Sequence, residues 1–164
     1  MALVGIFCVV LLVLTTVIHY EVLRMLTVGL PALDVPARAK LIAVIFAAFF
    51  AHALEIVLYA VAIYVLVRYL DAGTLGSANQ FSLTQCLYFS AETYSSLGYG
   101  DIVPGGPLRL LAGLEVLNGL LLIGWSASYT YIAMERFWSD AREGSAATMA
   151  QPGAAADAPQ AARR

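Results

Sequence analysis

Three long apolar runs constrain the fold of this chain more than any other feature of its sequence. They cover residues 2–30, 39–70 and 108–138. The hydrocarbon core of a bilayer is about 30 Å thick and an α-helix rises about 1.5 Å per residue, so each run is long enough to cross it. With 61% hydrophobic and 12% charged residues, the chain has too few polar side chains for a soluble domain. The sequence therefore predicts an all-α membrane protein with three transmembrane helices.

The first run, residues 2–30, has a competing interpretation as a secretory signal peptide. A signal peptide places basic residues ahead of an apolar stretch of about 7 to 15 residues. No basic residue precedes this run, and its apolar part is longer. We therefore expect a retained transmembrane helix followed by a short cytoplasmic loop, in which Pro31 and Pro36 break the helix.

The segment between the second and third runs contains a helix-start signal. Ser82 and Gln85 have the Ser-x-x-Gln spacing of a capping box, which predicts a helix of about 12 residues that ends at Tyr94. The C-terminus of a helix carries about half a negative charge. In a membrane of low dielectric constant, that charge favours a cation held just beyond the helix.

The stretch that follows this short helix has the features of an ion selectivity filter. A dehydrated cation needs successive rings of oxygen atoms that replace its water shell. Successive backbone carbonyls point the same way only where alternate residues adopt left-handed φ values, which Gly98 and Gly100 allow. The Ser96 hydroxyl adds a further oxygen ring, Tyr99 points away from the pore as a prop, and Asp101 lies at the outer mouth. The expected ion-binding residues are Ser96, Leu97, Gly98, Tyr99 and Gly100.

Residues 88–104 read YFSAETYSSLGYGDIVP and resemble the pore loop of the potassium channel superfamily, whose signature is Thr-Val-Gly-Tyr-Gly-Asp. The resemblance covers about residues 45–138, as outer helix, pore loop and inner helix, and is to small bacterial ion channels of the two-pore-domain type. Ser96 replaces the signature threonine and keeps its hydroxyl, whereas Leu97 replaces valine and keeps only an apolar packing role. The resemblance implies a passive, potassium-selective channel that catalyses no reaction, binds K⁺ in its filter and has no organic cofactor.

The resemblance also implies a role for two carboxyl groups beside the filter. Glu92 lies in the short helix, and Asp101 directly follows the filter. By resemblance to the proton-gated member of the family, the two would form a pair behind the filter and share one proton, because two close carboxylates cannot both ionise cheaply. Such a pair would tune filter inactivation with pH. A purely structural hydrogen bond that braces the filter is the alternative.

The third run carries glycines that are candidates for a gating hinge. Gly119 and Gly124 lie in the inner helix, where a glycine permits either a bend or close packing against a neighbouring helix, and both interpretations stay open. Glu115 lies about two turns from the outer end of the same helix. We expect it to pack against the pore helix rather than to line the cavity.

Ionisable groups inside the first two runs each need a partner, because a charge at the bilayer centre costs about 2.5 to 3.5 kcal/mol on insertion scales. These groups are His19, Glu21, His52 and Glu55. We expect them to satisfy one another, or Tyr20 and Tyr59, across the interface between the two helices. A zinc site is the less favoured alternative, because residues 19 and 21 point to different faces of a helix. We therefore expect no metal other than potassium in the filter.

The chain divides into three parts on this interpretation. Residues 1–38 form an extra N-terminal helix and loop, and residues 39–138 form the pore domain. Residues 139–164 have the composition of a disordered tail. Basic residues concentrate near the ends expected to face the cytoplasm, with Arg24, Arg38, Lys40, Arg136 and Arg142 there and Arg68 and Arg109 near the outer ends. This bias places the N-terminus outside and the tail in the cytoplasm, and we expect a bacterial inner membrane.

A single chain supplies one filter strand, whereas a ring of carbonyls needs four. The expected partners are therefore further copies of the chain, in a homotetramer with cyclic symmetry, and the lipid bilayer. The net charge of -2 argues against a nucleic-acid partner. Three alternatives stay open: a weakly selective cation channel, which Leu97 favours, a potassium transporter subunit, and a non-conducting membrane scaffold.

Overall fold

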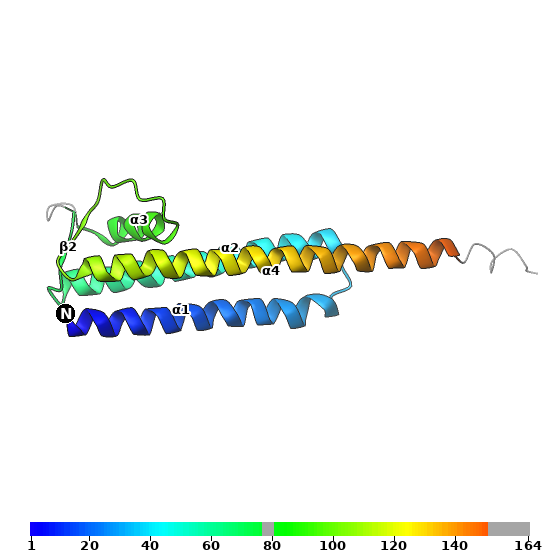
Figure 1. Ribbon diagram of the computed structural model, residues 1–164, viewed down its shortest axis with the longest axis horizontal. Helices are drawn as coiled ribbons and strands as arrows, with labels where there is room; N and C mark the ends of the chain where they lie inside the picture. The colour runs from blue at the N-terminus through cyan, green and yellow to red at the C-terminus, as the bar shows by residue number, and fades with distance from the viewer. Residues whose placement is uncertain (77–80, 151–164) are drawn as a thin grey trace, which may run out of the picture.

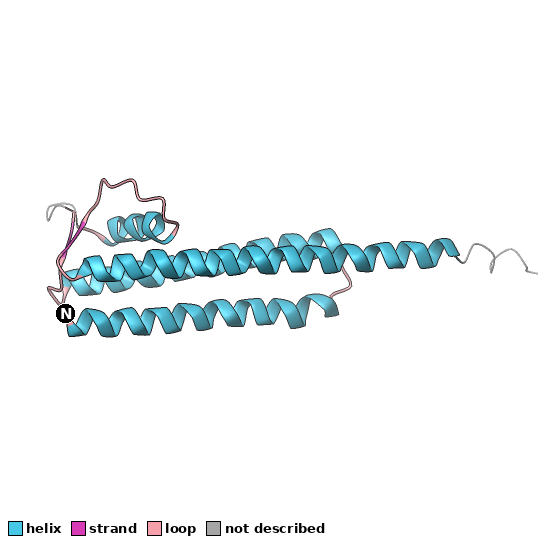
Figure 2. Cartoon of the chain, in the orientation of Figure 1, coloured by secondary structure: helices cyan, strands magenta, loops and turns pink. Residues whose placement is uncertain are grey.

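The computed structural model describes residues 1–76 and 81–150, and the described chain is almost entirely helical (Figure 2). Its elements in chain order are α1 (Ala2–Gly29), the short 3-10 helix η1 (Leu30–Ala32), α2 (Ala37–Arg68), β1 (Thr74–Leu75), α3 (Leu83–Tyr94), β2 (Pro104–Gly105) and α4 (Leu108–Ala150).

The three long helices α1, α2 and α4 form an antiparallel bundle (Figure 1). Within the described residues, the segments long and apolar enough to cross a membrane are Ala2–Ala32, Ala37–Arg68 and Leu108–Ser139. They correspond to the three predicted runs, so the prediction of an all-α protein with three transmembrane helices is confirmed. Large apolar side chains on their outer faces are exposed, as expected where a surface faces lipid or a neighbouring subunit.

Two prolines separate α1 from α2. Pro31 lies in the first turn of η1, and Pro36 is the N-cap of α2. Proline fits these positions because the first amides of a helix have no carbonyl partner within it. The chain therefore reverses direction within a few residues, as its sequence predicted.

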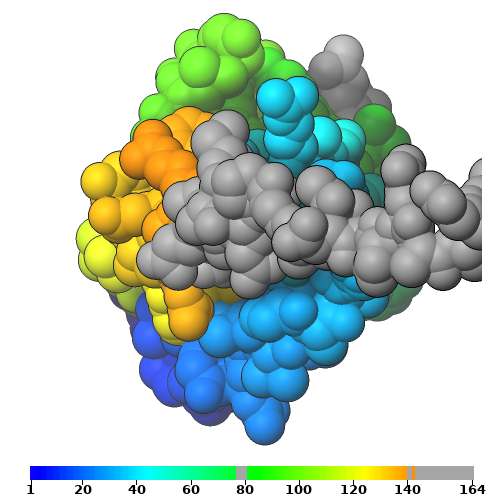
Figure 3. All heavy atoms as spheres, turned by 90° about the vertical axis from the view of Figure 1, so that its right-hand side faces the viewer, coloured from blue at the N-terminus to red at the C-terminus, as the bar shows by residue number. Residues whose placement is uncertain are grey.

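The core of the bundle lies between all four α-helices. Tyr59 and Ile63 of α2 are fully buried, and so are Leu108 and Leu111 of α4. Val4 of α1 belongs to the same apolar cluster. Figure 3, which looks along the bundle, shows α1 (blue) and the pore-loop segment (green) on opposite sides. The extra N-terminal helix thus packs behind α2 and α4, on the side away from the filter.

A two-stranded ladder joins the two ends of the pore-loop segment. Thr74 pairs with Gly105 and Leu75 pairs with Pro104, in antiparallel register. A Cβ at Gly105 would collide with the Thr74 hydroxyl, so a larger residue at this position requires the Thr74 side chain to change its rotamer. The ladder holds the start and the end of the segment that contains α3 and the filter side by side.

The predicted disorder of the tail needs correction. α4 continues to Ala150, so residues 139–150 are helical rather than disordered. Alanine, which favours helix most, occupies four of these twelve positions, and extending an existing helix avoids the cost of nucleating a new one. Residues 151–164, the remainder of the predicted tail, lie outside the described residues.

Candidate ion-conducting site

The short pore helix α3 begins and ends where its sequence predicted. Its N-cap is Ser82, whose side chain accepts a hydrogen bond from the Gln85 amide at 3.2 Å. The reciprocal half of the capping box is missing, because the side-chain oxygen Oε1 of Gln85 has no hydrogen-bond partner among the described residues. The helix spans 12 residues and ends at Tyr94. Its C-terminus is thus followed directly by the filter stretch.

The backbone of the filter alternates in handedness. Gly98 has φ of 54° and Gly100 has φ of 78°, the left-handed values that their residue type and spacing predicted. Ser96 also has a positive φ, of 56°, which no sequence signal indicated because serine has no special preference for this region. Left-handed residues therefore stand at every second position from 96 to 100.

The pore helix binds three successive filter amides. The N–H groups of Leu97 and Gly98 both donate to the Glu92 backbone carbonyl, at 2.8 and 3.2 Å. The next amide, that of Tyr99, donates to Glu92 Oε2 at 3.3 Å. In a trans peptide the carbonyl points opposite to the N–H of the same unit. The carbonyls of Ser96, Leu97 and Gly98 therefore point away from α3, toward the open side of the chain, where residues 95–101 are exposed.

Glu92 and Asp101, the predicted carboxyl pair, each bond to another residue. The buried Glu92 carboxyl accepts from the Tyr99 amide. The Asp101 carboxyl accepts from the Tyr88 hydroxyl at 3.2 Å. No hydrogen bond joins the two carboxyls in the described part of the chain. The Glu92 carboxyl holds the Tyr99 amide of the filter, and a proton shared with Asp101 stays a prediction.

The two candidate hinge glycines lie in different surroundings. A side chain at Gly119 would collide with the backbone carbonyl of Tyr94, so this glycine allows α4 to approach the end of α3 closely. A Cβ added at Gly124 would meet nothing within 4 Å. Close packing is thus the evident role of Gly119, while the conformational role proposed for Gly124 rests on sequence alone.

Glu115 packs against the pore helix, as expected. It is fully buried, and its Oε1 is hydrogen-bonded to the Ser90 hydroxyl of α3. The same hydroxyl lies 2.9 Å from the backbone carbonyl of Ile56 in α2. Ser90 therefore links the pore helix to both α2 and α4.

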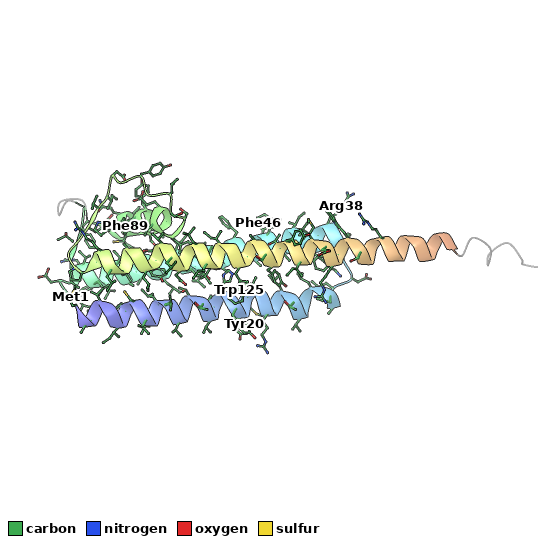
Figure 4. The ribbon with its side chains drawn as sticks, in the orientation of Figure 1. Met1, Tyr20, Arg38, Phe46, Phe89 and Trp125 are labelled. Carbon is green, nitrogen blue, oxygen red and sulfur yellow. The ribbon has the colours of Figure 1, made fainter. Side chains whose placement is uncertain are left out.

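The structure brings together three of the four ionisable groups from the first two runs. His19 and His52 both contact the Glu55 carboxyl, so these groups satisfy one another across the interface of α1 and α2. Glu21 lies on another face of α1 and pairs with Arg24 at 2.9 Å. Figure 4 labels Tyr20 on α1 and Trp125 on α4; Tyr20 is half exposed, and the centroids of these two rings lie 6.4 Å apart.

Sequence reasoning missed further polar contacts in this interface. Tyr94 and Ser126 join the histidine and glutamate side chains. Tyr59 does not, because its hydroxyl accepts from Asn118 at 3.2 Å. No local sequence pattern indicates these contacts, because they depend on how the helices are rotated about their axes.

The part of the chain that contains these elements matches a known family. The family model described as "Ion channel" matches residues 41–136, which is more than half of the chain. This chain belongs to the ion channel family. The match includes most of α2, all of α3 and the filter, and much of α4, and it leaves α1 outside. As an ion channel with three apolar helices, the protein is a multi-pass membrane protein.

One curated relative supports the same assignment. Over 70 residues the chain is 37% identical to the inward rectifier potassium channel Kirbac3.1 of Paramagnetospirillum magnetotacticum. The aligned part covers 42% of this chain and 24% of the relative, so the ion channel spans about a quarter of the length of the curated relative that it matches. No solved structure matches the chain.

Proposed function

We propose that this ion channel is a potassium-selective pore that conducts passively through a filter of backbone carbonyls. The observation that carries the proposal is the set of three successive amides held by Glu92 of the pore helix. Those bonds turn the carbonyls of Ser96, Leu97 and Gly98 to the open side, where a row of oxygens replaces the water shell of a cation. The curated relative is itself a potassium channel by name.

The working unit in this proposal is a homotetramer with cyclic symmetry, embedded in the lipid bilayer. One chain supplies one row of carbonyls, and closed rings of oxygens require four rows around an axis. In a single chain the filter is open to solvent, and Tyr99 is 68% exposed. Four copies would close the rings and cover Tyr99 with a neighbouring subunit, where it would act as the prop expected from the sequence.

Conduction in this proposal needs no chemical reaction and no organic cofactor. K⁺ ions occupy successive sites formed by carbonyls of residues 96–100 and by the Ser96 hydroxyl. Mutual repulsion between ions in neighbouring sites then drives each ion onward down its electrochemical gradient. Residues 39–138 form the pore domain, and residues 1–38 add a helix behind it.

The orientation that we propose follows from the distribution of basic side chains. Arg38, Lys40 and Arg136 lie near one end of the bundle, and Arg109 lies near the other. Because basic residues concentrate on the cytoplasmic side, the filter mouth and the N-terminus face outside and α4 ends in the cytoplasm. A bacterial inner membrane is the location that we propose.

Ion flux into liposomes tests the proposal. Purified protein is reconstituted, and potassium and sodium flux are measured separately for the wild type, Gly98→Asp and Gly29→Asp. Gly98 has a left-handed φ in the filter, whereas Gly29 is exposed at the end of α1 with nothing within 4 Å of an added Cβ. We expect potassium flux well above sodium flux, loss of flux in Gly98→Asp, and retained flux in the Gly29→Asp control.

Two outcomes would contradict the proposal in different ways. Equal potassium and sodium flux would show that the protein is a weakly selective cation channel, the alternative that Leu97 favours. Absence of flux under every condition, from protein that is tetrameric by mass, would favour a non-conducting scaffold.

A further inference from the structure

A closed ring of hydrogen-bonded side chains joins α1, α2 and α4 inside the membrane-spanning bundle. The Nδ1 atoms of His19 and His52 lie 3.0 and 3.2 Å from the two oxygens of the Glu55 carboxyl. Their Nε2 atoms both lie 3.1 Å from the Ser126 hydroxyl oxygen. His19 and Glu55 are fully buried. We call the four side chains of His19, His52, Glu55 and Ser126 the polar ring.

Hydrogen-bond counting fixes how many protons the polar ring holds. Each of its four contacts needs one proton between its two heavy atoms. The hydroxyl of Ser126 supplies one, so Glu55 and the two imidazoles together supply three. One arrangement pairs an ionised Glu55 with one imidazolium and one neutral imidazole. The other pairs a protonated Glu55 with two neutral imidazoles, and the net charge is zero in both.

A buried site favours this total of three protons on Glu55 and the two imidazoles. Removing a proton leaves a net negative charge and two acceptors facing each other, and adding one leaves a net positive charge and two facing donors. A buried charge, and a buried polar group without a partner, each carry a large free-energy cost in surroundings of low dielectric constant. The polar ring therefore binds one exchangeable proton that belongs to the group rather than to a single side chain.

The polar ring is connected to the filter through Tyr94, the last residue of the pore helix. The Tyr94 hydroxyl donates to Glu55 Oε2 and lies 3.0 Å from His52 Nδ1. The backbone carbonyl of Tyr94 rests against Gly119. Two residues further along the chain, Ser96 begins the filter, and its amide donates to the Thr93 carbonyl at 3.0 Å. Tyr94 thus contacts both the polar ring and the inner helix, two residues before the filter begins.

We propose that the polar ring is a proton-binding site whose occupancy by the shared proton holds Tyr94, and with it the filter, in the conducting arrangement. This inference rests on the proposed channel function, and it gives the N-terminal helix a role in regulation. As pH rises, loss of the shared proton leaves a charged ring with one unmade hydrogen bond. The two facing acceptors repel and separate, the Glu55 carboxylate moves with them, the Tyr94 hydroxyl that donates to it is displaced, and ion flux falls.

Few other titratable groups surround the polar ring. On α1, Tyr20 follows His19, but it is half exposed and its ring lies beside Trp125. On α2, Tyr59 lies one turn beyond Glu55 and is bonded to Asn118. On α4, the nearest carboxyl toward the outer end is Glu115, which is bonded to Ser90 of α3. Tyr94 of α3 is bonded to the polar ring, but it donates its own hydroxyl proton to Glu55, so the count of three protons on Glu55 and the two imidazoles is unchanged.

A divalent metal ion is the competing ligand for the same atoms. One nitrogen from each imidazole and one oxygen of Glu55 lie within 4.8 Å of one another. The contacts of 3.0 to 3.2 Å are ordinary hydrogen-bond lengths, and all four imidazole nitrogens already have a protein partner. Hydrogen bonds therefore account for all of these contacts without a metal ion, and zinc serves as a probe in the test.

Glu55→Gln separates the shared proton from the geometry of the polar ring. A glutamine oxygen accepts from His52 and Tyr94 while its NH₂ group donates to His19. His19 then donates to Ser126, and Ser126 donates to His52, so all four contacts are satisfied with two neutral imidazoles. The variant keeps the ring closed but has no proton to release as pH rises.

Ion flux as a function of pH is the first measurement. Reconstituted wild type, Glu55→Gln, Ser126→Ala and Ser128→Ala are compared between about pH 5 and pH 9. Ser128 is the matched control, because its hydroxyl is exposed and, among the described residues, bonds to the Gly124 carbonyl alone, at 3.0 Å. We expect the flux of wild type and of Ser128→Ala to fall at alkaline pH. The flux of Glu55→Gln should stay constant over the same range, and the flux of Ser126→Ala should fall at a lower pH than that of wild type. A wild-type profile flat on the alkaline side, or a decline that persists in Glu55→Gln, would overturn the coupling.

Histidine nitrogen spectra provide a readout that is independent of flux. The chain has only 2 histidines, so protein labelled with ¹⁵N-histidine reports on the polar ring alone. We expect His19 and His52 to lose one proton between them in a single coupled transition, and Glu55→Gln to lose none over the same range. Two independent titrations, or a zinc-induced change in these signals that His52→Gln abolishes, would overturn the proton site. If the wild type never conducts, both the channel proposal and the coupling between the polar ring and the filter fail. The histidine spectra still show whether the polar ring binds a shared proton.

Discussion

The backbone carbonyl of Tyr94 lies directly against Gly119, with no room for a side chain between them. The end of the pore helix therefore rests on the inner helix at one point, just before the filter begins. The same residue sends its hydroxyl to Glu55 of α2. Tyr94 is thus held from two sides by two different transmembrane helices.

Gly119→Ala is expected to displace the end of the pore helix. The added methyl group overlaps the Tyr94 carbonyl, and overpacking of this kind costs about 1–3 kcal/mol. We expect a lower apparent melting temperature in detergent and reduced potassium flux. Gly124→Ala is the matched control, because nothing lies within 4 Å of its added Cβ. Equal behaviour of the two variants would show that the contact with Tyr94 is not tight in the working channel.

Glu92→Ala is expected to weaken ion selectivity. The substitution removes the side-chain oxygen that accepts from the Tyr99 amide, and a hydrogen bond of this kind contributes about 0.5–1.5 kcal/mol. Glu92→Gln keeps an acceptor oxygen and should retain most of the selectivity. Reversal potentials in mixed potassium and sodium measure the difference. The interpretation fails if Gln and Ala variants lose selectivity equally, because charge rather than hydrogen bonding would then be the important property.

Glu115→Gln is expected to be tolerated, whereas Glu115→Ala is not. The Ser90 hydroxyl has one proton but contacts two acceptors, the Ile56 carbonyl and the Glu115 carboxyl. A protonated Glu115 resolves this by donating to Ser90, which donates to Ile56, and a glutamine amide can replace it. Melting temperatures in detergent should therefore be similar for Gln and wild type and lower for Ala. A strongly destabilised Gln variant would show that Glu115 is ionised.

Tyr99→Ala is expected to weaken the tetramer. In the single chain Tyr99 is 68% exposed, although it lies in the filter, and the proposed assembly covers it with a neighbouring subunit. Tyr69→Ala is the matched control, because Tyr69 is also largely exposed, at 72%, but lies at the C-cap of α2. The temperature at which tetramers dissociate in detergent, measured by size and mass, distinguishes the two. Similar temperatures for both variants would contradict a role for Tyr99 between subunits.

Local rules predicted much of the fold and of the filter. Ser82 caps the pore helix, and Gly98 adopts a left-handed φ, because each outcome depends on residue type and near neighbours. The length of the apolar runs was sufficient to predict the three long helices. The left-handed φ of Ser96 was not predictable in this way, since it is imposed by the bonds that hold the neighbouring peptides.

Contacts between helices were the part that the sequence predicted least. His19 and Glu55 were expected to find each other because they lie at similar depths. Their connection to Ser126 and Tyr94 depends on how four helices are rotated about their axes, which no local pattern specifies. The helical character of residues 139–150 was missed for a different reason, because a small-residue composition is compatible with both a helix and a disordered chain.

The contact between the pore helix and Gly119 sets an order of events during synthesis of the protein. Both strands of the ladder, Thr74–Leu75 and Pro104–Gly105, precede α4 in the chain, whereas the pore helix rests on Gly119 within α4. The contact with Gly119 cannot form until the last transmembrane helix has been made and inserted beside the first two. The filter is therefore the final element of each subunit to take shape, after every span has entered the membrane.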